Sequence, residues 1–462
     1  MSYGNLHCSP DRIGCVKTLG DLDALVEKVG AAQRSFSEFP QWEVDKIFKA
    51  AAIAAKKKAI ELAEMAVAET GMGIVDDKIT KNKFASEFVY NRYRREKTCG
   101  IISHSRVNGI KVVADPVGVI AGVVPTTNPT STAIFKTLIS LKTRNGIVIS
   151  PHPRAKNCTV TASRIVLEAA VEAGAPNCII GWLGDPTMEL SNALMQHRAI
   201  HLILATGGPG MVRAAYSSGK PAIGVGSGNT PAVIDETANI HAAISAVISS
   251  KTFDNGMICA SEQSIVAVDD VYATVKEELS QGGAHIMDER ESVAVGKIIL
   301  SDKGINADIV GQSAHTIGKL AGIDVPEHTT VLVSEEKSRA MENPFSHEKL
   351  SPILALYKAP CFVEAVEMAL ELVSVGGLGH TAVLHTDAKD QWRIGYFATK
   401  MPVGRVLVNV PATHGAIGLC NCHVTPSLTL GCGSWGGNSS SDNIGVKHLL
   451  NYKIVAEARS AK

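Results

Sequence analysis

Two segments near the start of the chain carry apolar residues at every third or fourth position. They run from Leu22 to Phe36 and from Val44 to Ile60. This spacing places the apolar side chains on one face of an amphipathic helix. The sequence therefore predicts a helical beginning.

A segment of β character follows Cys99 and runs from Gly100 to Ala114. The dipeptide Asn108-Gly109 interrupts it, and such a dipeptide is a strong signal for a type I′ turn between two antiparallel strands. We expect a β-hairpin that projects from the fold.

Short apolar runs then alternate with helical stretches in two series, a pattern typical of parallel sheets that helices bury on both faces. The first series comprises residues 117–124, 146–150, 160–172, 178–183, 201–205, 211–216 and 221–225. The second begins near Ile234 and includes residues 264–268, 330–333, 353–357 and 405–408. We predict a doubly wound α/β domain followed by a second α/β unit. Residues 431–443, rich in Gly, Ser and Asn, read as a solvated loop before a C-terminal tail.

The length and charge of the chain narrow its class. Its 462 residues exceed one compact core, so two or three structural units are expected. Lys plus Arg and Asp plus Glu each count 45, which leaves no net field to attract nucleic acid or an acidic membrane surface. No apolar run reaches the roughly 18 residues that span a bilayer, and the opening residues lack the parts of a signal peptide. We expect a cytoplasmic protein with neither partner.

The cysteines argue against disulfides and metal. Ten of them are spread along the chain without the dense spacing of a secreted disulfide scaffold, so we expect reduced thiols. Cys420-x-Cys422-His423 resembles half of a metal site, but no second pair stands at zinc-site spacing. We therefore predict no metal.

Two short segments carry candidate chemistry. Residues 206–210 read Thr-Gly-Gly-Pro-Gly between a predicted strand and a predicted helix. Glycines there let backbone N–H groups approach a phosphate, but a tight turn without a ligand gives the same pattern. Cys259 stands in a polar, Gly-containing segment, where we expect a thiol to be exposed and ionised. An unremarkable buried thiol is the alternative.

Five motifs occur in order along nearly the whole chain. They are Pro-Thr-Thr-Asn-Pro-Thr-Ser-Thr at 125–132, Ser-Pro-His-Pro-Arg-Ala at 150–155, Ala-Thr-Gly-Gly-Pro-Gly at 205–210, Phe-Asp-Asn-Gly-Met-Ile-Cys-Ala-Ser-Glu-Gln-Ser at 253–264 and His-Glu-Lys-Leu-Ser-Pro at 347–352. Together they resemble the CoA-acylating aldehyde dehydrogenases. The likeness is strongest to the N-terminal half of bifunctional aldehyde-alcohol dehydrogenases and to free-standing acylating sulfoacetaldehyde dehydrogenases.

The resemblance implies an α/β fold of aldehyde dehydrogenase type. Residues 1–233 would form a Rossmann-type cofactor domain, residues 234–425 a catalytic domain, and residues 426–462 a return segment with an oligomerisation tail. The hairpin at 100–115 would belong to a β oligomerisation arm, which implies a homodimer or homotetramer.

The resemblance also implies roles for individual residues. Cys259 matches the thiolate that attacks the aldehyde and carries first a thiohemiacetal and then a thioester. Asn128, with the backbone N–H of Cys259, matches the donors that hold the developing oxyanion. Glu348 matches the carboxylate that hydrogen-bonds the ribose next to the nicotinamide. The remaining cofactor-binding positions are Thr126, Ser150, His152, Pro153, Gly207, Gly208, Val225 and Gly226.

One difference from hydrolytic relatives concerns the acyl acceptor. Where those enzymes carry a Glu that activates water, this sequence has Val225, so attack by water on the thioester lacks its general base. The thiol of CoA is a good nucleophile toward thioesters and can still take the acyl group. Likeness to acylating members favours NAD as the cofactor. NADP stays open as the alternative, because Arg154 could pair with a 2′-phosphate.

The aldehyde itself is less well specified. His414 stands where bifunctional enzymes usually have Gln, which favours a polar or anionic two-carbon aldehyde held by His414 or Thr413, with neutral drift as the alternative. His347 either touches substrate or CoA or is a satisfied loop histidine. We expect a free-standing cytoplasmic enzyme that converts acetaldehyde or sulfoacetaldehyde to its acyl-CoA. The rival hypotheses are a hydrolytic semialdehyde dehydrogenase and a non-catalytic assembly protein of the same fold.

Overall fold

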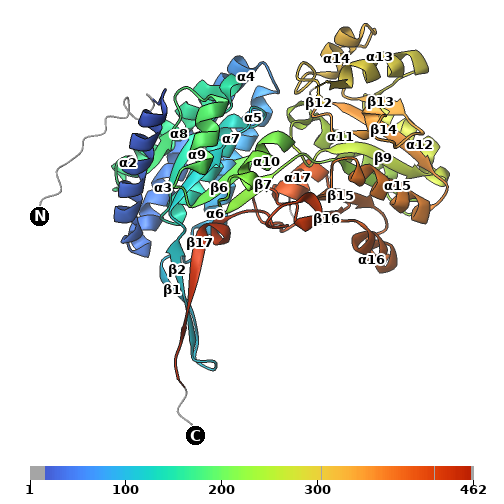
Figure 1. Cartoon of the computed structure of the whole chain (residues 1–462). Coiled ribbons are helices and arrows are strands. Elements are labelled where there is room, and N and C mark those ends of the chain that lie inside the picture. Colours follow the sequence, from blue (N-terminus) through green and yellow to red (C-terminus); the bar gives the residue numbers. More distant parts are fainter. Residues whose placement is uncertain (1–15, 303, 421, 459–462) are drawn as a thin grey trace, which may run out of the picture.

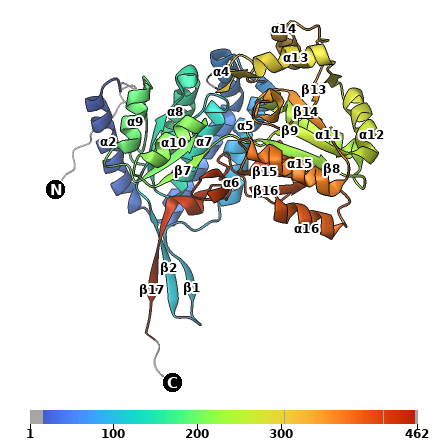
Figure 2. The ribbon, with the colours of Figure 1, turned by 45° about the vertical axis from the view of Figure 1, so that its right-hand side comes forward.

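Two parallel sheets and an antiparallel arm make up the fold in a computed structural model, which describes residues 16–302, 304–420 and 422–458 (Figure 1). The five-stranded sheet with its helices lies on one side and the seven-stranded sheet with its helices on the other (Figures 1 and 2). This mixed α/β architecture confirms the predicted fold class. The start of the predicted cofactor domain, residues 1–15, and the end of the predicted oligomerisation tail, residues 459–462, lie outside the described residues.

Six helices among the described residues precede the first sheet in the chain. They are α2 (Leu19–Ser37), α3 (Gln41–Lys57), α4 (Ala59–Thr70), α5 (Val75–Lys83), the π-helix η1 (Phe84–Phe88) and α6 (Val89–Tyr93). Helix α2 packs on the strands of this sheet, and the others pack mainly on its crossover helices and on one another. The predicted helix 44–60 is split, because Lys58 leaves the helical conformation with φ −98° and ψ 11°. Leu25 and Val29 on the apolar stripe of α2 are buried against Gly146 and Gly181 of the sheet.

The first sheet is doubly wound. Its parallel strands, in spatial order, are β5 (Ile180–Trp182), β4 (Gly146–Ser150), β3 (Val119–Val123), β6 (Leu202–Thr206) and β7 (Ala222–Val225). Its crossover helices are α7 (Pro129–Lys142), α8 (Lys156–Glu172), α9 (Met188–Gln196) and α10 (Pro209–Ser217). The strand order reverses between β3 and β6, so a crevice opens at the carboxyl ends of these two neighbours.

The second sheet has seven parallel strands. In spatial order they are β10 (His285–Ile286), β13 (Leu332–Glu335), β14 (Ile353–Ala359), β9 (Glu262–Val268), β8 (Thr230–Ile234), β15 (Gly379–His385) and β16 (Val403–Val408). The helices of this half are α11 (Ile240–Thr252), the short η3 (Phe253–Gly256), α12 (Asp269–Gln281), α13 (Glu289–Ile299), α14 (Ala314–Ala321), η4 (Pro344–Ser346), α15 (Phe362–Ser374), α16 (Gln391–Lys400) and α17 (Ala412–Ile417). No helix among the described residues is long and apolar enough to cross a membrane.

The chain crosses from the first sheet to the second earlier than the predicted boundary at 233. Strand β8 pairs with β9 and β15 and not with β7. The crossing therefore falls between Val225 and Thr230. The glycine-rich turn at 226–229 ends the first sheet, and the apolar run after it already belongs to the second.

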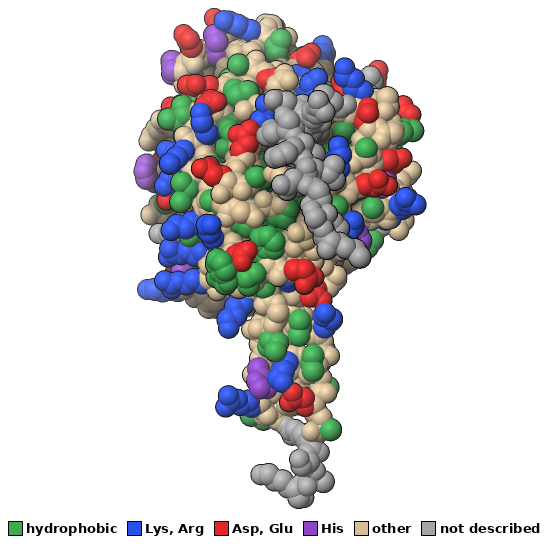
Figure 3. Space-filling view, turned by 90° about the vertical axis from the view of Figure 1, so that its left-hand side faces the viewer, with side chains coloured by type: hydrophobic (Ala, Val, Ile, Leu, Met, Phe, Trp, Pro, Cys, Tyr) green, Lys and Arg blue, Asp and Glu red, His purple; other side chains and the backbone are tan. Residues whose placement is uncertain are grey.

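The antiparallel arm consists of β1 (Gly100–Ser105), β2 (Ile110–Pro116) and β17 (Leu450–Ala456) and extends away from both sheets (Figures 1 and 3). The predicted hairpin is present, but its turn is not type I′. Residues 106–109 connect the strands, and of the pair Asn108-Gly109 only Gly109 has a positive φ, of 63°. A type I′ turn needs positive φ at both central residues.

Residues 431–443 are only in part the solvated loop that their composition suggested: residues 434–437, 439 and 441 are exposed, whereas both ends of the segment bind the core. The buried guanidinium of Arg405 on β16 donates to the Gly431 carbonyl at 2.7 Å and to Asn443 Oδ1 at 3.1 Å. Cys432 is only 3% exposed. Gly, Ser and Asn are common in loops, but here the segment supplies the oxygen atoms that satisfy a buried cation.

Candidate active site

The loops that follow β3 and β6 leave the first sheet at the same edge. The two strands are parallel neighbours, with Val123 opposite Ala205. Asn128 ends the first loop as the N-cap of α7, and Pro129 follows at the first helical position, where its missing N–H costs no hydrogen bond. Gly208 is the N-cap of α10 at the end of the second loop. Open α/β sheets bind ligands at such a switch point.

These loops have the features of a phosphate-binding turn. A Cβ added at Gly208 or Gly226 would meet no atom within 4 Å, so both positions face open space. Gly207 lies between Thr206 and Gly208 in the sequence, and a Cβ added to it would approach Met211 at 3.4 Å. The hydroxyls of Thr126 and Thr206 are buried without a hydrogen-bond partner among the described residues. Open glycine backbones, unused hydroxyls and a helix N-terminus fit the predicted dinucleotide cofactor.

Ser150 ends β4, and His152 and Pro153 follow it at the same edge, but polar atoms of Ser150 and His152 already have partners. Ser150 Oγ lies 2.9 Å from Ser191 Oγ, and His152 Nδ1 accepts the backbone N–H of Arg154 at 3.2 Å. Burial lowers the pKa of His152, which keeps its ring neutral. Pro153 opens a short 3₁₀ turn. Contact of these three residues with the adenosine half of a cofactor stays a prediction.

Glu348 binds the turn that connects the two sheets. Its Oε1 accepts the backbone N–H of Gly228 at 3.1 Å. The side chain is 7% exposed, and burial raises its pKa to about 8 against the lowering effects of the Gly228 N–H, Lys251 and Lys349. A carboxyl that is largely protonated near neutral pH can both donate to and accept from ribose hydroxyls.

Cys259 packs against the same turn. A Cβ added at Gly228 would overlap the carbonyl oxygen of Cys259. The thiol is half-buried, and burial, Glu348 and Cys432 raise its pKa to about 12, whereas Arg405 lowers it. The raised pKa argues against the predicted ionised thiol, whereas the partial exposure of Cys259 agrees with the predicted access. Burial removes water from the thiolate, and Glu348 adds negative charge once it ionises.

Asn128 contacts the segment that leads to Cys259. Its Nδ2 donates to the Met257 carbonyl and to Thr127 Oγ1, both at 3.2 Å. Its Oδ1 accepts Lys81 Nζ at 2.7 Å. Asn128 thus binds the segment that carries Cys259, two residues before the cysteine. The amide N–H groups are held by two long hydrogen bonds, which an oxyanion can replace.

Three buried side chains at the site were not predicted from the sequence. They are Lys81, Arg405 and His380, and the last lies against the same glycine as Cys259, because a Cβ added at Gly228 would stand 3.0 Å from its Cγ. Its Nδ1 shares a hydrogen bond with Thr381, its Nε2 has no partner among the described residues, and burial holds its pKa well below the ordinary value. With its pKa held this low, the ring stays neutral and is a poor acceptor for the thiol proton near neutral pH.

His414 remains a candidate wall of the aldehyde site. Its ring packs edge-on against Phe253, with centroids 4.9 Å apart. Burial, and then the charge of Lys81, lower its pKa. A neutral imidazole attracts an anionic aldehyde less strongly than a protonated imidazole would.

Thr413 and His347 are bonded within the protein. Thr413 is fully buried, and its hydroxyl donates to the Ser250 carbonyl at 3.1 Å. It is therefore not available to an aldehyde, contrary to the prediction. His347 Nε2 lies 2.6 Å from the Met341 carbonyl, which supports the satisfied loop histidine over the substrate contact.

Val225 ends β7 opposite Thr206 and is 2% exposed. The turn that follows it reads Gly-Ser-Gly-Asn, so no carboxylate stands on residues 225–229. The nearby carboxyl of Glu348 is already bonded to Gly228.

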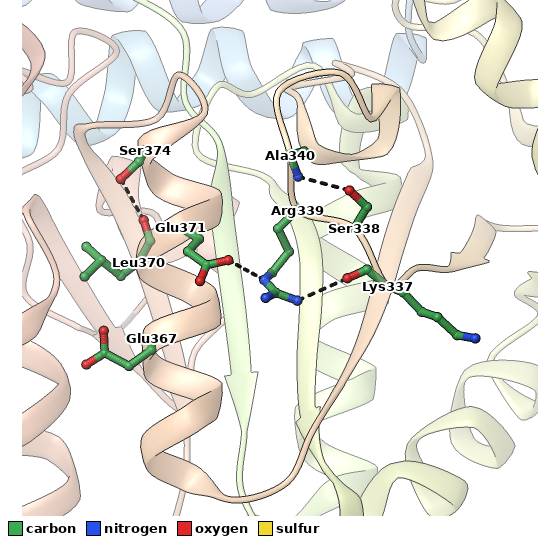
Figure 4. A pocket seen from close by; sticks show the side chains of 8 residues that line it. All are labelled: Lys337, Ser338, Arg339, Ala340, Glu367, Leu370, Glu371 and Ser374. Atoms are coloured by element: carbon green, nitrogen blue, oxygen red, sulfur yellow. Dashed lines mark hydrogen bonds and ion pairs between the residues drawn. The ribbon is translucent and has the colours of Figure 1, made fainter.

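A shallow pocket between α15 and the loop after β13 contains none of the candidate residues. Figure 4 shows the eight residues that line it: Lys337, Ser338, Arg339, Ala340, Glu367, Leu370, Glu371 and Ser374. Arg339 Nε already donates to Glu371 at 2.5 Å, and its Nη1 donates to the Lys337 carbonyl at 3.1 Å. The guanidinium is therefore satisfied without a ligand.

Known proteins resemble this chain over nearly its whole length. The bifunctional aldehyde-alcohol dehydrogenase AdhE of Escherichia coli K12 is 58% identical over 96% of this chain, which spans 50% of that relative. A sulfoacetaldehyde dehydrogenase (acylating) of Cupriavidus necator is 37% identical, over 94% of this chain and 88% of that one. The crystal structure of an acetylating aldehyde dehydrogenase from Geobacillus thermoglucosidasius superposes with a TM-score of 0.94 at 48% identity, covering 96% of this chain and 98% of that one. These matches confirm the resemblance drawn from the five motifs.

Two more distant structures contain ligands. A propionaldehyde dehydrogenase of Rhodopseudomonas palustris, with a TM-score of 0.84 at 28% identity and covering 94% of this chain and 97% of that one, holds CoA and an acylated cysteine. An engineered glycolyl-CoA reductase, with a TM-score of 0.85 at 28% identity and covering 96% of this chain and 98% of that one, holds NADP⁺. The model of the aldehyde dehydrogenase family matches residues 16–419. The chain therefore belongs to the aldehyde dehydrogenase family.

Proposed function

We propose that this chain is a CoA-acylating aldehyde dehydrogenase, which oxidises a small aldehyde to its acyl-CoA through a thioester on Cys259. The proposal is carried by one combination. Asn128 binds the segment of Cys259, and the apolar Val225 stands at the position where hydrolytic relatives have a Glu. The thioester can then form, while water lacks a general base to attack it.

The first step joins the thiol to the aldehyde. The Cys259 proton passes to water, and the sulfur attacks the carbonyl carbon. As the C–S bond forms, the carbonyl electron pair moves to oxygen, and Asn128 Nδ2 with the Cys259 backbone N–H stabilises the oxyanion. Loss of one such donor typically costs about a hundred- to a thousand-fold in rate.

The oxidation step needs the cofactor that the crevice fits. When bound, a nicotinamide dinucleotide accepts the hydride from the thiohemiacetal carbon. The turn at 206–208 and Gly226 would hold its pyrophosphate, and Glu348 would bind the ribose beside the ring. NAD is favoured, and NADP is the alternative because Arg154 is exposed beside the predicted adenosine contact.

The thioester then reacts with a thiol. CoA sulfur attacks the acyl carbon, the C–S bond to Cys259 breaks, and the enzyme thiolate regains a proton. Thiolates attack thioesters readily without a carboxylate base. Acetaldehyde is the favoured substrate, because the pKa of His414 is lowered and its neutral ring faces Phe253. The name of the acetylating relative from Geobacillus thermoglucosidasius points the same way.

The arm supports a homodimer or homotetramer, which we propose to lie in the cytoplasm. Ile101, Val107, Ile454 and Val455 on its strands and turn are 43–78% exposed. Apolar side chains along a projecting sheet are typical of a surface that a second copy covers. Light scattering of the purified protein would measure the stoichiometry, and a monomer would contradict this part of the proposal.

One assay separates the proposal from its rivals. Acetaldehyde, propionaldehyde, sulfoacetaldehyde and succinate semialdehyde are each tested with NAD or NADP, with and without CoA. We expect turnover only with CoA and one acyl-CoA for each reduced cofactor. Equal turnover to free acid without CoA would identify the hydrolytic enzyme. No cofactor reduction with any aldehyde would favour the non-catalytic assembly protein.

A further inference from the structure

Helix α5 inserts two lysines between the halves of the site. Lys78 and Lys81 are each 2% exposed, and their i, i+3 spacing places them on the same face of the helix. Both contact Asp254 Oδ2, Lys78 Nζ at 3.0 Å and Lys81 Nζ at a closer approach. Asp254 is fully buried on η3, five residues before Cys259. A carboxylate shared by two buried ammonium groups fixes this loop to the helix.

The two lysines differ in their remaining partners. Lys78 Nζ donates to the carbonyl of Thr127 at 3.1 Å. Lys81 Nζ donates to Asn128 Oδ1 at 2.7 Å and to the Met257 carbonyl at 3.1 Å. With Asp254, these acceptors use all three N–H donors of the Lys81 ammonium. Of the two, only Lys81 touches the amide side chain that is to hold the oxyanion.

The ammonium also decides which way the Asn128 amide points. An ammonium group has donors only, so it must face the amide oxygen and not the NH₂ group. A flipped amide would place two donors against each other in a buried site, which costs at least one lost hydrogen bond. The Nδ2 atom therefore stays on the side of Met257 and the nucleophile segment. Without the ammonium both orientations would become accessible.

The loop that carries Asp254 needs such restraint. Asp254 and Asn255 adopt φ of 50° and 53°, and Gly256 follows with φ 76°. Non-glycine residues in this region are strained and persist only where their surroundings fix them. A Cβ at Gly73 would overlap Asp254 Oδ1, so the loop is seated closely against the chain before α5. The backbone N–H of Ile74 donates to the same oxygen at 2.8 Å.

We propose that Lys81 is a positioning residue of the active site: its ammonium orients the Asn128 amide and binds the Met257 carbonyl, which keeps the oxyanion donor and the Cys259 segment in register. This inference rests on the proposed role of Asn128 and Cys259. Lys81 does not touch the aldehyde itself and acts through Asn128.

The charges around Lys81 come from three elements. Lys78 and Asp77 lie on its own helix, Asp254 lies on η3, and His414 lies on α17. Burial lowers the pKa of Lys81 to about 8, with Asp254 acting in the opposite direction. An amine that loses its proton above this pH can accept from an amide NH₂ group. Its hold on the orientation of Asn128 is then lost.

A double-mutant cycle between Lys81→Met and Asn128→Ala tests the inference. The readout is the rate of the first NADH formed per active site from acetaldehyde and NAD without CoA, so the identity of the acyl acceptor does not enter. We expect Lys81→Met to slow this step about 10- to 100-fold, as small misplacements of catalytic groups do. In the Asn128→Ala background it should slow the step less than about threefold further.

Lys78→Met is the matched control, because it removes an equally buried lysine from the same face and the same carboxylate. Its effect should be the same in both backgrounds. The inference would be overturned if the rate reduction of the double variant equalled the product of the reductions by Lys81→Met and Asn128→Ala. It would also be overturned if Lys78→Met lost its effect in the Asn128→Ala background to the same degree as Lys81→Met. A wild type that forms NADH without CoA but never yields acyl-CoA would instead refute the acylating proposal alone.

A second variant covers the case in which Lys81→Met does not fold. Lys81→Arg keeps the charge and does not titrate below pH 12. The ratio of its NADH burst rate to that of the wild type should therefore rise as the pH increases from 7 to 9.5, across the pKa of Lys81. A wild-type to variant ratio that is constant over this range would contradict the role of the Lys81 charge.

Discussion

Glu348→Gln removes a buried carboxyl whose pKa is higher in the folded protein than in the unfolded chain. The ordinary pKa of 4.5 rises to about 8 in the folded protein, because burial disfavours the charged form. The folded state therefore binds more protons than the unfolded chain between these values, and the wild type loses stability as the pH rises from about 4.5 to 8. Gln keeps an oxygen for the Gly228 N–H but cannot ionise. The stability of the variant relative to the wild type should thus increase with pH.

The pKa difference sets the size of this effect. At about 1.4 kcal/mol for each tenfold change in proton affinity, it corresponds to an upper bound of about 5 kcal/mol. Relaxation around the ionised group and access of water reduce this bound, so we expect a change of about 1 to 3 kcal/mol between pH 5 and 8. Such a change shifts the melting temperature by several degrees.

The assay is thermal unfolding of both proteins at one scan rate and one protein concentration across pH 5 to 8. Glu342→Gln serves as the control, because Glu342 is an exposed carboxylate of the same loop. The control should give a difference from wild type that does not change with pH. A flat difference for Glu348→Gln, or a wild type that gains relative stability with rising pH, would refute the argument that this carboxyl is buried and protonated.

Four further variants test other parts of the site and the fold. Val225→Glu buries a carboxyl at a position that is 2% exposed; it should lower the melting temperature and raise the release of free acid without CoA, both measured on purified protein. Gly228→Ala should abolish NADH formation, because its Cβ would overlap the Cys259 carbonyl, whereas Gly226→Ala, with no atom within 4 Å, should keep the fold and mainly raise KM for the cofactor. Ile454→Lys, at a side chain that is 71% exposed on the arm, should reduce the oligomeric mass in light scattering without changing the melting of the monomeric fold.

Apolar periodicity predicted the elements that bury a face. Strand β4 matches the predicted run 146–150 at both ends, and α2 extends the predicted stripe by a few residues. The break at Lys58 was not predictable, since neither Pro nor Gly marks it and only its φ and ψ reveal it. The sheet boundary was placed late because the apolar run of β8 continues the pattern of the first sheet.

The candidate site was predictable where local sequence carries the chemistry. The loop around Asn128, the glycines at 207 and 208 and the turn before Cys259 all lie at the crevice or its rim. Lys81 could not be found in this way, because α5 reads Val-Asp-Asp-Lys-Ile-Thr-Lys-Asn-Lys, like a solvated helix. Its burial depends on Asp254, a residue 173 positions away in the sequence. The raised pKa of Cys259 could not be predicted in this way either, since it arises mainly from burial and then from Glu348, which reaches the thiol only through the fold.

The central claim is that Cys259 carries the acyl group and passes it to CoA. Mass spectrometry of the tryptic peptide 252–276, in which Cys259 is the only cysteine, tests this directly after incubation with acetaldehyde and NAD. Without CoA, we predict that the peptide gains the mass of one acetyl group; on addition of CoA, the acetyl group should leave the peptide and appear as acetyl-CoA. An unmodified peptide with continued release of acetate, or an acetyl group that CoA does not remove, would contradict the account.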